Sequence, residues 1–216
     1  MLTVESISKK IEGNVILNDF SFSINSGERL ALVGPSGSGK TTILKCIAGL
    51  LKTDTGKITC CNKVFNDTGI FLPPWERKIG MVFQDLALWP HLTIKQHLDY
   101  VFKWIKYEKS QRNYRLNYLL TLLEIEQFKM RYPHQLSGGQ QQRLALARLL
   151  ASEPAIALLD EAFNQLDSKL SEKIWKILID LQSNNNLTII FTSHDRDAVN
   201  QYSTNTVNLT HSNLNS

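Results

Sequence analysis

The chain has 216 residues, of which 43% are hydrophobic and 20% charged, and its formal net charge is +4 at pH 7. These proportions are those of an ordinary folded globular chain, so they exclude a disordered tail, a collagen and a coiled coil. The positive charge is small and comes without a block of basic residues, so it does not indicate nucleic acid as a partner.

Nothing in the sequence predicts a membrane span or an export signal. The longest apolar runs, such as residues 156–159, are only a few residues long, whereas a bilayer span needs about 20. The first residues, Met1 to Glu5, carry neither a basic leader nor a long apolar stretch. We therefore expect a cytoplasmic protein.

The three cysteines, Cys46, Cys60 and Cys61, show no C-x-x-C spacing. Adjacent residues on a strand point to opposite faces, so Cys60 and Cys61 are expected to lie apart if a strand holds both. We interpret all three as ordinary core or surface thiols.

The first third of the chain has the pattern of strands. Phe20, Phe22 and Ile24 alternate with polar residues, which predicts one buried face. Residues 29–33 form a short apolar strand that leads into a glycine-rich loop, and residues 40–51 have the pattern of a helix. Turn-rich strands are expected from there to residue 83.

From about residue 93 to 130 the pattern changes to helix, with an apolar stripe of Leu116, Leu119, Leu120 and Leu123. A helix at 138–151, a strand at 155–159, an amphipathic helix with apolar positions from 170 to 181 and a strand at 187–191 follow. Strands that alternate with helices indicate a mostly parallel α/β sheet. Residues 200–216 are rich in Asn, Ser and Thr, which predicts a frayed end.

The loop from Gly34 to Thr41 reads G-P-S-G-S-G-K-T and fits the phosphate-binding pattern G-x-x-x-x-G-K-[ST]. Glycines let backbone N–H groups turn toward phosphate oxygens, and the start of the following helix adds positive potential. Lys40 then supplies a charge to the outer phosphates, and Thr41 a hydroxyl to Mg²⁺.

An apolar strand at residues 156–159 ends in two carboxylates, Asp160 and Glu161. The carboxyl ends of parallel strands are where α/β sheets bind ligands. Asp160 suits the Mg²⁺ site there, and Glu161 suits a base or a group that positions water.

The segment Leu136-Ser137-Gly138-Gly139-Gln140 opens a helix with two glycines, which is an unusual choice for an ordinary capped start. Exposed backbone N–H groups at such a start make a second anion site. An ordinary capped helix is the alternative interpretation.

In this order the motifs resemble those of the nucleotide-binding subunits of ABC transporters, over essentially the whole chain. The resemblance implies an α/β fold: a P-loop NTPase (RecA-like) core with a mostly parallel sheet, an N-terminal antiparallel β subdomain and an inserted α-helical subdomain. We expect one ATP-binding domain over 1–216, with a core of 1–85 and 136–216 and a helical insertion at 86–135. The 22 residues after His194 are too few for a C-terminal regulatory domain, so none is expected.

The resemblance also implies roles for individual residues. The catalytic residues are Glu161, the switch histidine His194 and the Q-loop glutamine Gln84. Asp167 matches the D-loop aspartate. The cofactor is expected to be Mg²⁺, bound by Thr41, Gln84 and Asp160, and the substrate is expected to be ATP. The nucleotide-binding residues are those of the phosphate loop with the next threonine and one residue near the adenine: Gly34, Pro35, Ser36, Gly37, Ser38, Gly39, Lys40, Thr41, Thr42 and Ile11.

In the family, two subunits pair head to tail, and a signature segment of one closes over the ATP of the other. Here those residues are Leu136, Ser137, Gly138, Gly139 and Gln140. The resemblance therefore implies an ATP-dependent homodimer with two-fold symmetry.

Residues 72–80 and 89–93 are similar to ATP-binding subunits of bacterial binding-protein-dependent importers for iron, polyamines, sulfate or molybdate. This implies ATP hydrolysis that powers import, integral membrane permease subunits as partners, an indirect link to a substrate-binding protein, and a place on the inner face of the membrane. Leu86, Leu88 and Trp89 are then expected to line a groove for a permease helix, with plain core packing as the alternative.

Three departures from the family pattern stand out. Ile11 occupies the place of the usual adenine-stacking aromatic residue, Ala162 replaces a proline, and residues 164–167 replace a D-loop of small residues. Two other functions stay open: a non-transport ABC ATPase, and a nucleotide-binding scaffold with weak turnover.

Overall fold

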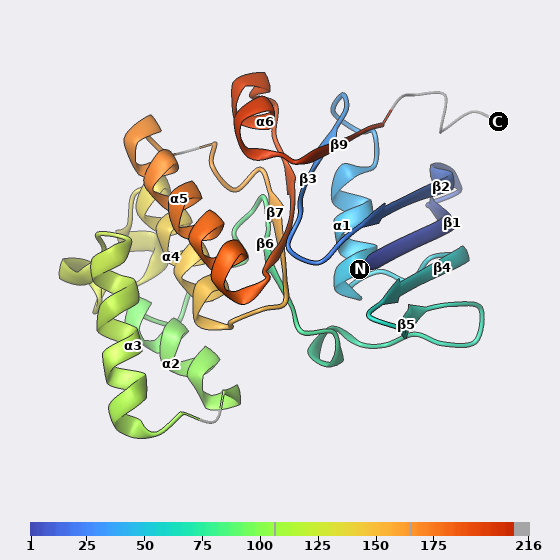
Figure 1. Cartoon of the computed structure of the whole chain (residues 1–216). Coiled ribbons are helices and arrows are strands. Elements are labelled where there is room, and N and C mark those ends of the chain that lie inside the picture. The colour runs from blue at the N-terminus through green and yellow to red at the C-terminus, as the bar shows by residue number, and fades with distance from the viewer. Residues whose placement is uncertain (106, 165, 210–216) are drawn as a thin grey trace. The chain divides into compact units, whose positions relative to one another are not determined.

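The structure is a computed structural model that describes residues 1–105, 107–164 and 166–209 (Figure 1). The chain divides into two compact units. The first unit contains Met1–Met81, Ala155–Asp160 and the chain from residue 179 onward, and the second contains Val82–Pro154 and Glu161–Leu178. The expected insertion at 86–135 falls inside the second unit, and its exact bounds stay a prediction.

The first unit holds an antiparallel sheet of four strands. Their order across the sheet is β2 (Asn14–Ile24), β1 (Leu2–Ile11), β4 (Thr55–Cys60) and β5 (Lys63–Asn66). Phe20 and Ile24 are buried, as the alternation in that strand predicts. This is the predicted N-terminal antiparallel subdomain.

The second sheet has five strands in the order β6 (Ile79–Val82), β7 (Ile156–Asp160), β8 (Thr188–Thr192), β3 (Arg29–Val33) and β9 (Asn205–Asn208). The pairs β7·β8, β8·β3 and β3·β9 are parallel. All five residues of β7 and of β8 are buried, which fits strands covered on both faces.

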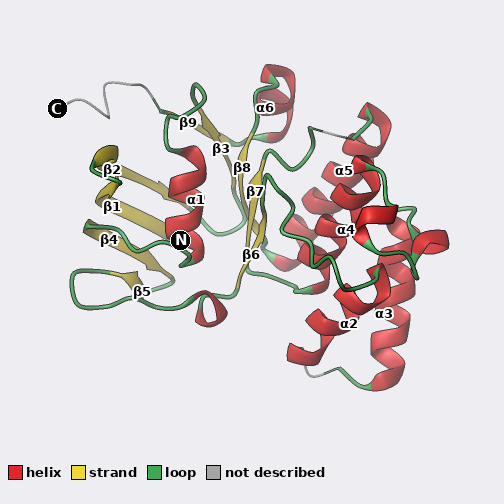
Figure 2. Ribbon diagram, turned by 180° about the vertical axis from the view of Figure 1, so that it is seen from behind, coloured by secondary structure: helices red, strands yellow, loops and turns green. Residues whose placement is uncertain are grey.

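Helix α1 (Lys40–Ala48) lies between the two sheets of the first unit (Figure 2). Its apolar residues Ile43, Leu44 and Ile47 share one buried cluster with residues of both sheets. The helix ends earlier than the expected residue 51, because Gly49 adopts φ +80° and closes it with backbone bonds to Lys45 and Cys46.

The second unit is helical. Helix α4 (Gly138–Ala151) packs against α2 (Ile94–Trp104) and α3 (Lys109–Leu122), and α5 (Ser168–Asn185) begins in this unit. Short 3₁₀ turns occupy Pro74–Glu76 in the first unit and Glu126–Phe128 and Pro133–Gln135 in the second. The predicted leucine stripe on α3 is confirmed, since Leu116, Leu119, Leu120 and Leu123 are all buried.

The frayed end predicted from residue 200 onward is wrong for the described part of it. Helix α6 (Arg196–Tyr202) and strand β9 continue the fold, and Leu209 N–H donates to the Val33 carbonyl at 2.7 Å. An edge strand is held by backbone hydrogen bonds, so its side chains can be polar. Residues 210–216 lie outside the described part of the chain.

Candidate functional site

The phosphate loop joins β3 to α1 through Gly39, which has φ +90°. A Cβ there would stand 2.8 Å from Leu17 Cδ2 and 3.1 Å from the Ile16 carbonyl, so only glycine fits. Among the described residues no side chain caps this helix start. The first N–H groups of α1 therefore keep their capacity to bind an anion.

Lys40 is only 6% exposed and lies along the same loop. Its Nζ donates to the carbonyl oxygens of Gly34 and Pro35, both at 2.8 Å. These two bonds stabilise a buried ammonium that has no carboxylate partner among the described residues. Thr41 and Thr42 follow in the first turn of α1.

Three buried side-chain oxygens of the first unit have no hydrogen-bond partner among the described residues: Asn66 Oδ1, Ser38 Oγ and Asp160 Oδ2. Asp160 is 2% exposed, and its other oxygen accepts from Thr192 Oγ1 at 2.9 Å. A buried carboxylate oxygen without a partner is costly unless a ligand or water satisfies it. Ser38 and Asp160, but not Asn66, were predicted from the sequence to face the phosphates or the metal.

Three parts of the predicted site lie at the carboxyl ends of neighbouring parallel strands. The phosphate loop follows β3, Asp160 ends β7, and His194 follows β8. His194 lines a cavity of about 660 Å³ together with the phosphate-loop residues Gly34 and Pro35, and with Arg196 and Asn200 of α6. The structure therefore brings His194 next to the start of the phosphate loop.

In the second unit, Glu161 and Gln84 are in contact. Gln84 Nε2 donates to Glu161 Oε2 at 3.2 Å, and Asn164 Nδ2 donates to the same oxygen at 2.9 Å. Glu161 has φ +51°, a conformation that costs free energy for any residue except glycine. Asn164, which the sequence marked only as a departure, thus restrains the predicted base.

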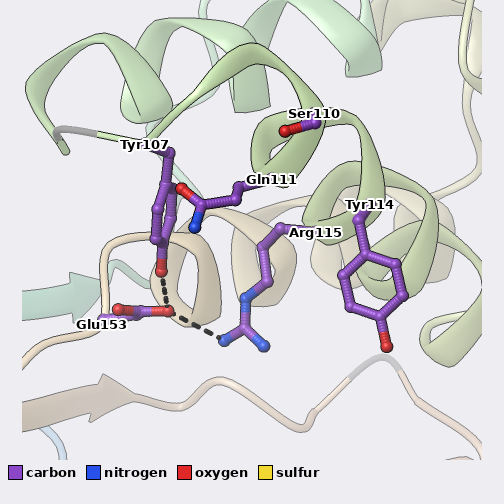
Figure 3. Close-up of a pocket in the computed structure, with 6 residues that line it drawn as sticks. All are labelled: Tyr107, Ser110, Gln111, Tyr114, Arg115 and Glu153. Carbon is purple, nitrogen blue, oxygen red and sulfur yellow. Dashed lines mark hydrogen bonds and ion pairs between the residues drawn. The ribbon is translucent and has the colours of Figure 1, made fainter.

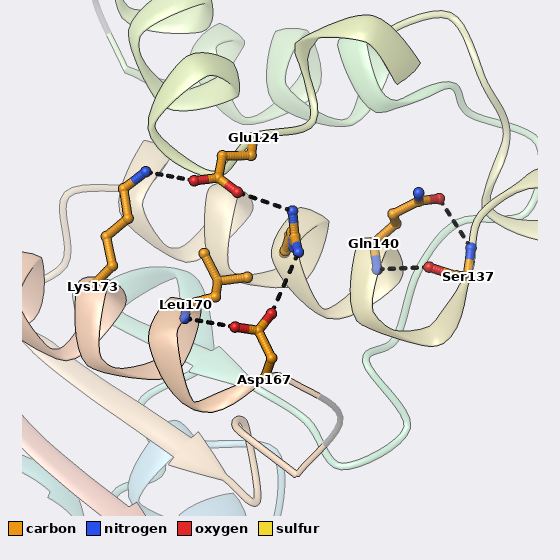
Figure 4. A network of polar contacts seen from close by, with 7 residues as sticks. Glu124, Ser137, Gln140, Asp167, Leu170 and Lys173 are labelled. Carbon is orange, nitrogen blue, oxygen red and sulfur yellow. Dashed lines mark hydrogen bonds and ion pairs between the residues drawn. The ribbon is translucent and has the colours of Figure 1, made fainter.

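The signature segment opens α4 with a reciprocal cap (Figure 4). Ser137 Oγ accepts from Gln140 N–H at 3.4 Å, and Gln140 Oε1 accepts from Ser137 N–H at 3.0 Å. This capping box is an ordinary way to start a helix. The role of the segment toward a second ATP stays a prediction.

Asp167 belongs to a polar network in the second unit (Figure 4). It accepts from Leu170 N–H at 3.0 Å and lies 3.9 Å from Arg143, whose guanidinium also lies 3.6 Å from Glu124. A hydrogen bond from Lys173 at 2.8 Å lowers the pKa of Glu124. These carboxylates are more than half exposed, so the network orients the Asp167 side chain more than it stabilises the fold; its D-loop role stays a prediction.

Trp89 lies at the centre of an aromatic row in the second unit. Its ring stacks on His97 at 5.4 Å and meets Tyr100 edge-on at 4.9 Å, and Tyr100 meets Trp104 at 6.4 Å. The guanidinium of Arg148 lies 4.4 Å from the Trp89 ring. Trp104 is 77% exposed and Tyr100 is 42% exposed, and their i, i+4 spacing is the signal that could have added them to the predicted groove.

His97 fixes the position of Trp89. It is fully buried, and burial lowers its pKa. Its Nε2 accepts from Trp89 N–H at 3.0 Å, so its Nδ1 carries the proton and donates to the Thr93 carbonyl at 2.8 Å. The neutral ring thus ties the loop after Gln84 to the start of α2.

A second cavity, of about 420 Å³, lies in the helical unit (Figure 3). Glu153 accepts a hydrogen bond from the Tyr107 hydroxyl and lies 3.4 Å from Arg115, and Tyr114 stands apart from this pair. Burial and the bond to Glu153 raise the pKa of Tyr107. These contacts tie α3 to the loop after α4, which is a structural role.

Ile11 lies at the end of β1 and is 40% exposed, opposite Asn14 across a two-residue turn. It belongs to the same unit as the phosphate loop. An exposed aliphatic side chain at a strand end is common on its own, so its place beside the adenine stays a prediction.

Comparisons with known proteins identify the family. Residues 17–164 match the family model described as ABC transporter. Among solved structures, the chain is 33% identical to a dimeric ATP-binding cassette, MJ0796, in a post-hydrolysis state bound to ADP and phosphate, with a TM-score of 0.87 and a match that covers 97% of this chain and 94% of that one. The chain belongs to the ABC transporter family and has the fold of its ATP-binding cassettes.

Two curated relatives are similar over 91% of this chain. One is the Fe(3+) ions import ATP-binding protein FbpC 2 of Pectobacterium atrosepticum, 41% identical over 197 residues. The other is the Fe(3+) ions import ATP-binding protein FbpC of Fusobacterium nucleatum, 38% identical over 196 residues. The chain spans about half the length of these relatives, 56% and 52% respectively.

Among the described residues, no helix is both long and apolar enough to cross a membrane.

Proposed function

We propose that the chain binds ATP with Mg²⁺ at the phosphate loop and hydrolyses it as the nucleotide-binding subunit of an import system. The observation that carries this proposal is the start of α1 at Lys40, which no side chain in the described part of the chain caps. Lys40 points back along the loop that precedes the helix, and at Gly39 of that loop only glycine fits. A helix start of this kind is built to hold phosphate oxygens.

The donor set of the first unit suits Mg²⁺. The Thr41 hydroxyl and the unpartnered Oδ2 of Asp160 are hard oxygen ligands, which Mg²⁺ prefers. No group of three or more His, Cys, Asp or Glu side chains is placed to hold a metal in the described part of the chain, which fits an ion that takes the rest of its ligands from phosphate and water. Bound there, Mg²⁺ would neutralise phosphate charge.

Each residue then has a defined task. Lys40 leaves the loop carbonyls to donate to a phosphate oxygen, and His194 donates from the cavity beside Gly34. Glu161 accepts a proton from the attacking water, and Gln84 holds the same carboxylate from the side.

The partners follow from the relatives. By analogy with the Fe(3+) import proteins, we expect ferric iron as the cargo. The dimeric solved cassette supports an ATP-dependent homodimer, and the family resemblance adds permease subunits and a place at the inner face of the cell membrane. The row Trp89, Tyr100 and Trp104 supports a permease-docking surface, because exposed aromatic side chains are typical of interface cores. Leu86 and Leu88 are half-buried beside it in the sequence.

The variant Glu161→Gln tests the proposal. The amide keeps the shape of the side chain and removes its basicity, so we expect ATP binding to persist and turnover to fall by about 10²-fold or more. ATP should then hold the variant as a stable dimer. ATPase rates and sedimentation with and without ATP measure both effects.

Glu172→Gln is the matched control, since Glu172 is an exposed carboxylate on α5. It should keep the normal rate. A Glu161→Gln variant that hydrolyses ATP at the normal rate and forms no ATP-dependent dimer would remove the role given to Glu161.

Asn164 makes the weak-turnover alternative testable. If its bond to Glu161 slows hydrolysis, Asn164→Ser should raise turnover, because serine is too short to hold the carboxylate at 2.9 Å. Equal ATP hydrolysis rates in Asn164→Ser and in the unchanged chain would show that the bond from Asn164 to Glu161 does not slow hydrolysis.

A further inference from the structure

Cys60 and Cys61 lie at the tip of the hairpin between β4 and β5, and their Sγ atoms are 3.8 Å apart. The expectation that the two side chains point to opposite faces does not hold, because β4 ends at Cys60. Cys61 instead has φ +49°, and Asn62 has φ +64°. Two adjacent left-handed residues reverse the chain, and this reversal turns the second thiol back toward the first.

The turn fixes this arrangement. Cys60 pairs with Lys63 across the hairpin, so Cys61 and Asn62 form a two-residue connection with positive φ at both positions. Such turns favour Asn, Asp or Gly, and Asn62 fits this preference. This type of turn does not favour cysteine at its first position, so the backbone conformation does not explain why residue 61 is a cysteine.

The pair is accessible, whereas the third cysteine is not. Cys61 is exposed and Cys60 is half-buried, but Cys46 is fully buried in the core of the first unit. The Cys60 thiol donates a hydrogen bond to Cys61 Sγ. Burial and this bond raise the pKa of Cys60 to about 11, and burial raises that of Cys46 to about 12.

We propose that Cys60 and Cys61 chelate a soft divalent cation of the Zn²⁺ or Cd²⁺ kind. With Zn–S bonds of about 2.3 Å and a tetrahedral angle, two thiolate sulfurs stand about 3.8 Å apart, which is the separation found here. Thiolate is the ligand that such ions prefer. The site therefore needs little rearrangement to bind.

Binding exchanges protons for metal and changes no oxidation state. Two S–H bonds break, two S–M bonds form, and two protons pass to solvent, so the affinity rises with pH. The described residues add no third His, Cys, Asp or Glu ligand. The α-ammonium of Met1 donates to Cys61 Sγ at 3.9 Å and must give up this contact when a metal ion binds, and water or a small ligand fills the other positions. An open site of this type suits reversible binding. The proposal does not depend on the proposed ATPase function.

Titration of the reduced 216-residue chain with Cd²⁺ tests the proposal through the ultraviolet thiolate-to-cadmium absorption band. We expect one ion per chain, with two protons released. Cys60→Ser and Cys61→Ser should each weaken binding by about 10²-fold or more, because each removes one arm of the chelate. Thermal unfolding without metal checks that the variants keep the fold.

Two controls separate a chelate from scattered thiols. Cys46→Ala should keep the band, whereas Cys60→Ser combined with Cys61→Ser, which leaves only the buried Cys46, should lose it. Pretreatment of the unchanged chain with phenylarsine oxide, which bridges paired thiols, should also abolish the band. Retained affinity in either single serine variant, or one ion per two chains, would overturn the proposal.

Discussion

Helices α1 and α4 both begin beside glycine, but they satisfy their ends in opposite ways. The first turn of α1 has no side-chain cap among the described residues, whereas α4 closes its first turn with the capping box of Ser137 and Gln140. The difference lies in the residue before each helix. Gly39 offers no side chain, and Ser137 offers a hydroxyl.

Of the two helices, only α1 has first-turn N–H groups that no side chain among the described residues caps, so only α1 can accept an anion without breaking an existing bond. The open end of α1 keeps its N–H groups for phosphate, while α4 uses Ser137 Oγ within its own first turn. A phosphate reaching α4 must compete with that internal bond, which is long at 3.4 Å. If the start of α4 meets a partner's ATP, as we propose, the phosphate has only this one long bond to displace.

The C-terminal end of α1, in contrast to its start, is capped by a side chain. Arg77 is 3% exposed, and its guanidinium donates to the carbonyl oxygens of Cys46 and Ile47 in the last turn and of Leu72 and Phe65 nearby. The carbonyls of Cys46 and Ile47 carry the negative end of the dipole of α1. Burial lowers the pKa of Arg77 to about 10, so the group stays charged at neutral pH.

The largest effect is expected when Arg77 is removed. Arg77→Met leaves four carbonyl oxygens without this donor in a buried place, and we expect the free energy of unfolding to fall by about 3–5 kcal/mol. Urea unfolding followed by circular dichroism measures the loss. Arg131→Met, at an exposed arginine over the Phe128 ring, should change stability little. Equal stability of the two variants would show that the end of α1 does not depend on Arg77.

A smaller effect is expected at the start of α4. Ser137→Ala removes the cap and should lower the free energy of unfolding by about 1 kcal/mol. Ser183→Ala, at an exposed serine within α5, is the control and should be near neutral. A drop of the same size in both variants would mean that the capping box contributes nothing particular.

Ser137→Arg sharpens the same comparison at the level of binding. The bulky side chain should leave ATP affinity of the isolated chain nearly unchanged and prevent ATP-driven dimerisation and turnover, since the contact is expected only across the dimer. A large loss of affinity in the dilute monomer would instead place the start of α4 in the same site as α1.

The smallest effect concerns Ile11, in the same unit as α1. An aromatic ring over adenine adds about 0.5–1.5 kcal/mol, so Ile11→Tyr should tighten ATP binding by about two- to tenfold, while turnover at saturating ATP changes little. Titration with a fluorescent nucleotide measures this. Ile70→Tyr, at an isoleucine that is also exposed in the first unit, is the control. Unchanged affinity would remove Ile11 from the adenine site.

Local patterns predicted much of the fold, because strands β3, β7 and β8 are apolar runs and α1 follows a glycine loop. The polar strand β9 was missed because it is held by backbone bonds to β3. The helical region expected from about 93 to 130 contains two helices, α2 and α3, and the break between them, where Ile105 and Glu108 are extended, was not predicted. The Gln111 side chain marks the new start, since its Oε1 accepts from Glu108 N–H at 3.0 Å.

The candidate site was predictable where a residue type and a spacing carry the chemistry, as for Lys40 and Asp160. Contacts between distant segments were not. Neither the bond from Asn164 to Glu161 nor the place of Arg143 between Glu124 and Asp167 follows from a local pattern. Such contacts exist only once the chain has folded.

The pairing of β3 has a consequence for the order of folding during synthesis. This strand leads into the phosphate loop, yet its two neighbours in the sheet, β8 and β9, begin at residues 188 and 205. A ribosome makes β3 early, and the strand must wait for more than two thirds of the chain before either edge is paired. Contacts so distant along the chain slow folding and leave an unpaired apolar strand exposed to other chains. Among the described residues, the segment that we propose binds phosphate is thus one of the first to be made and one of the last to become complete.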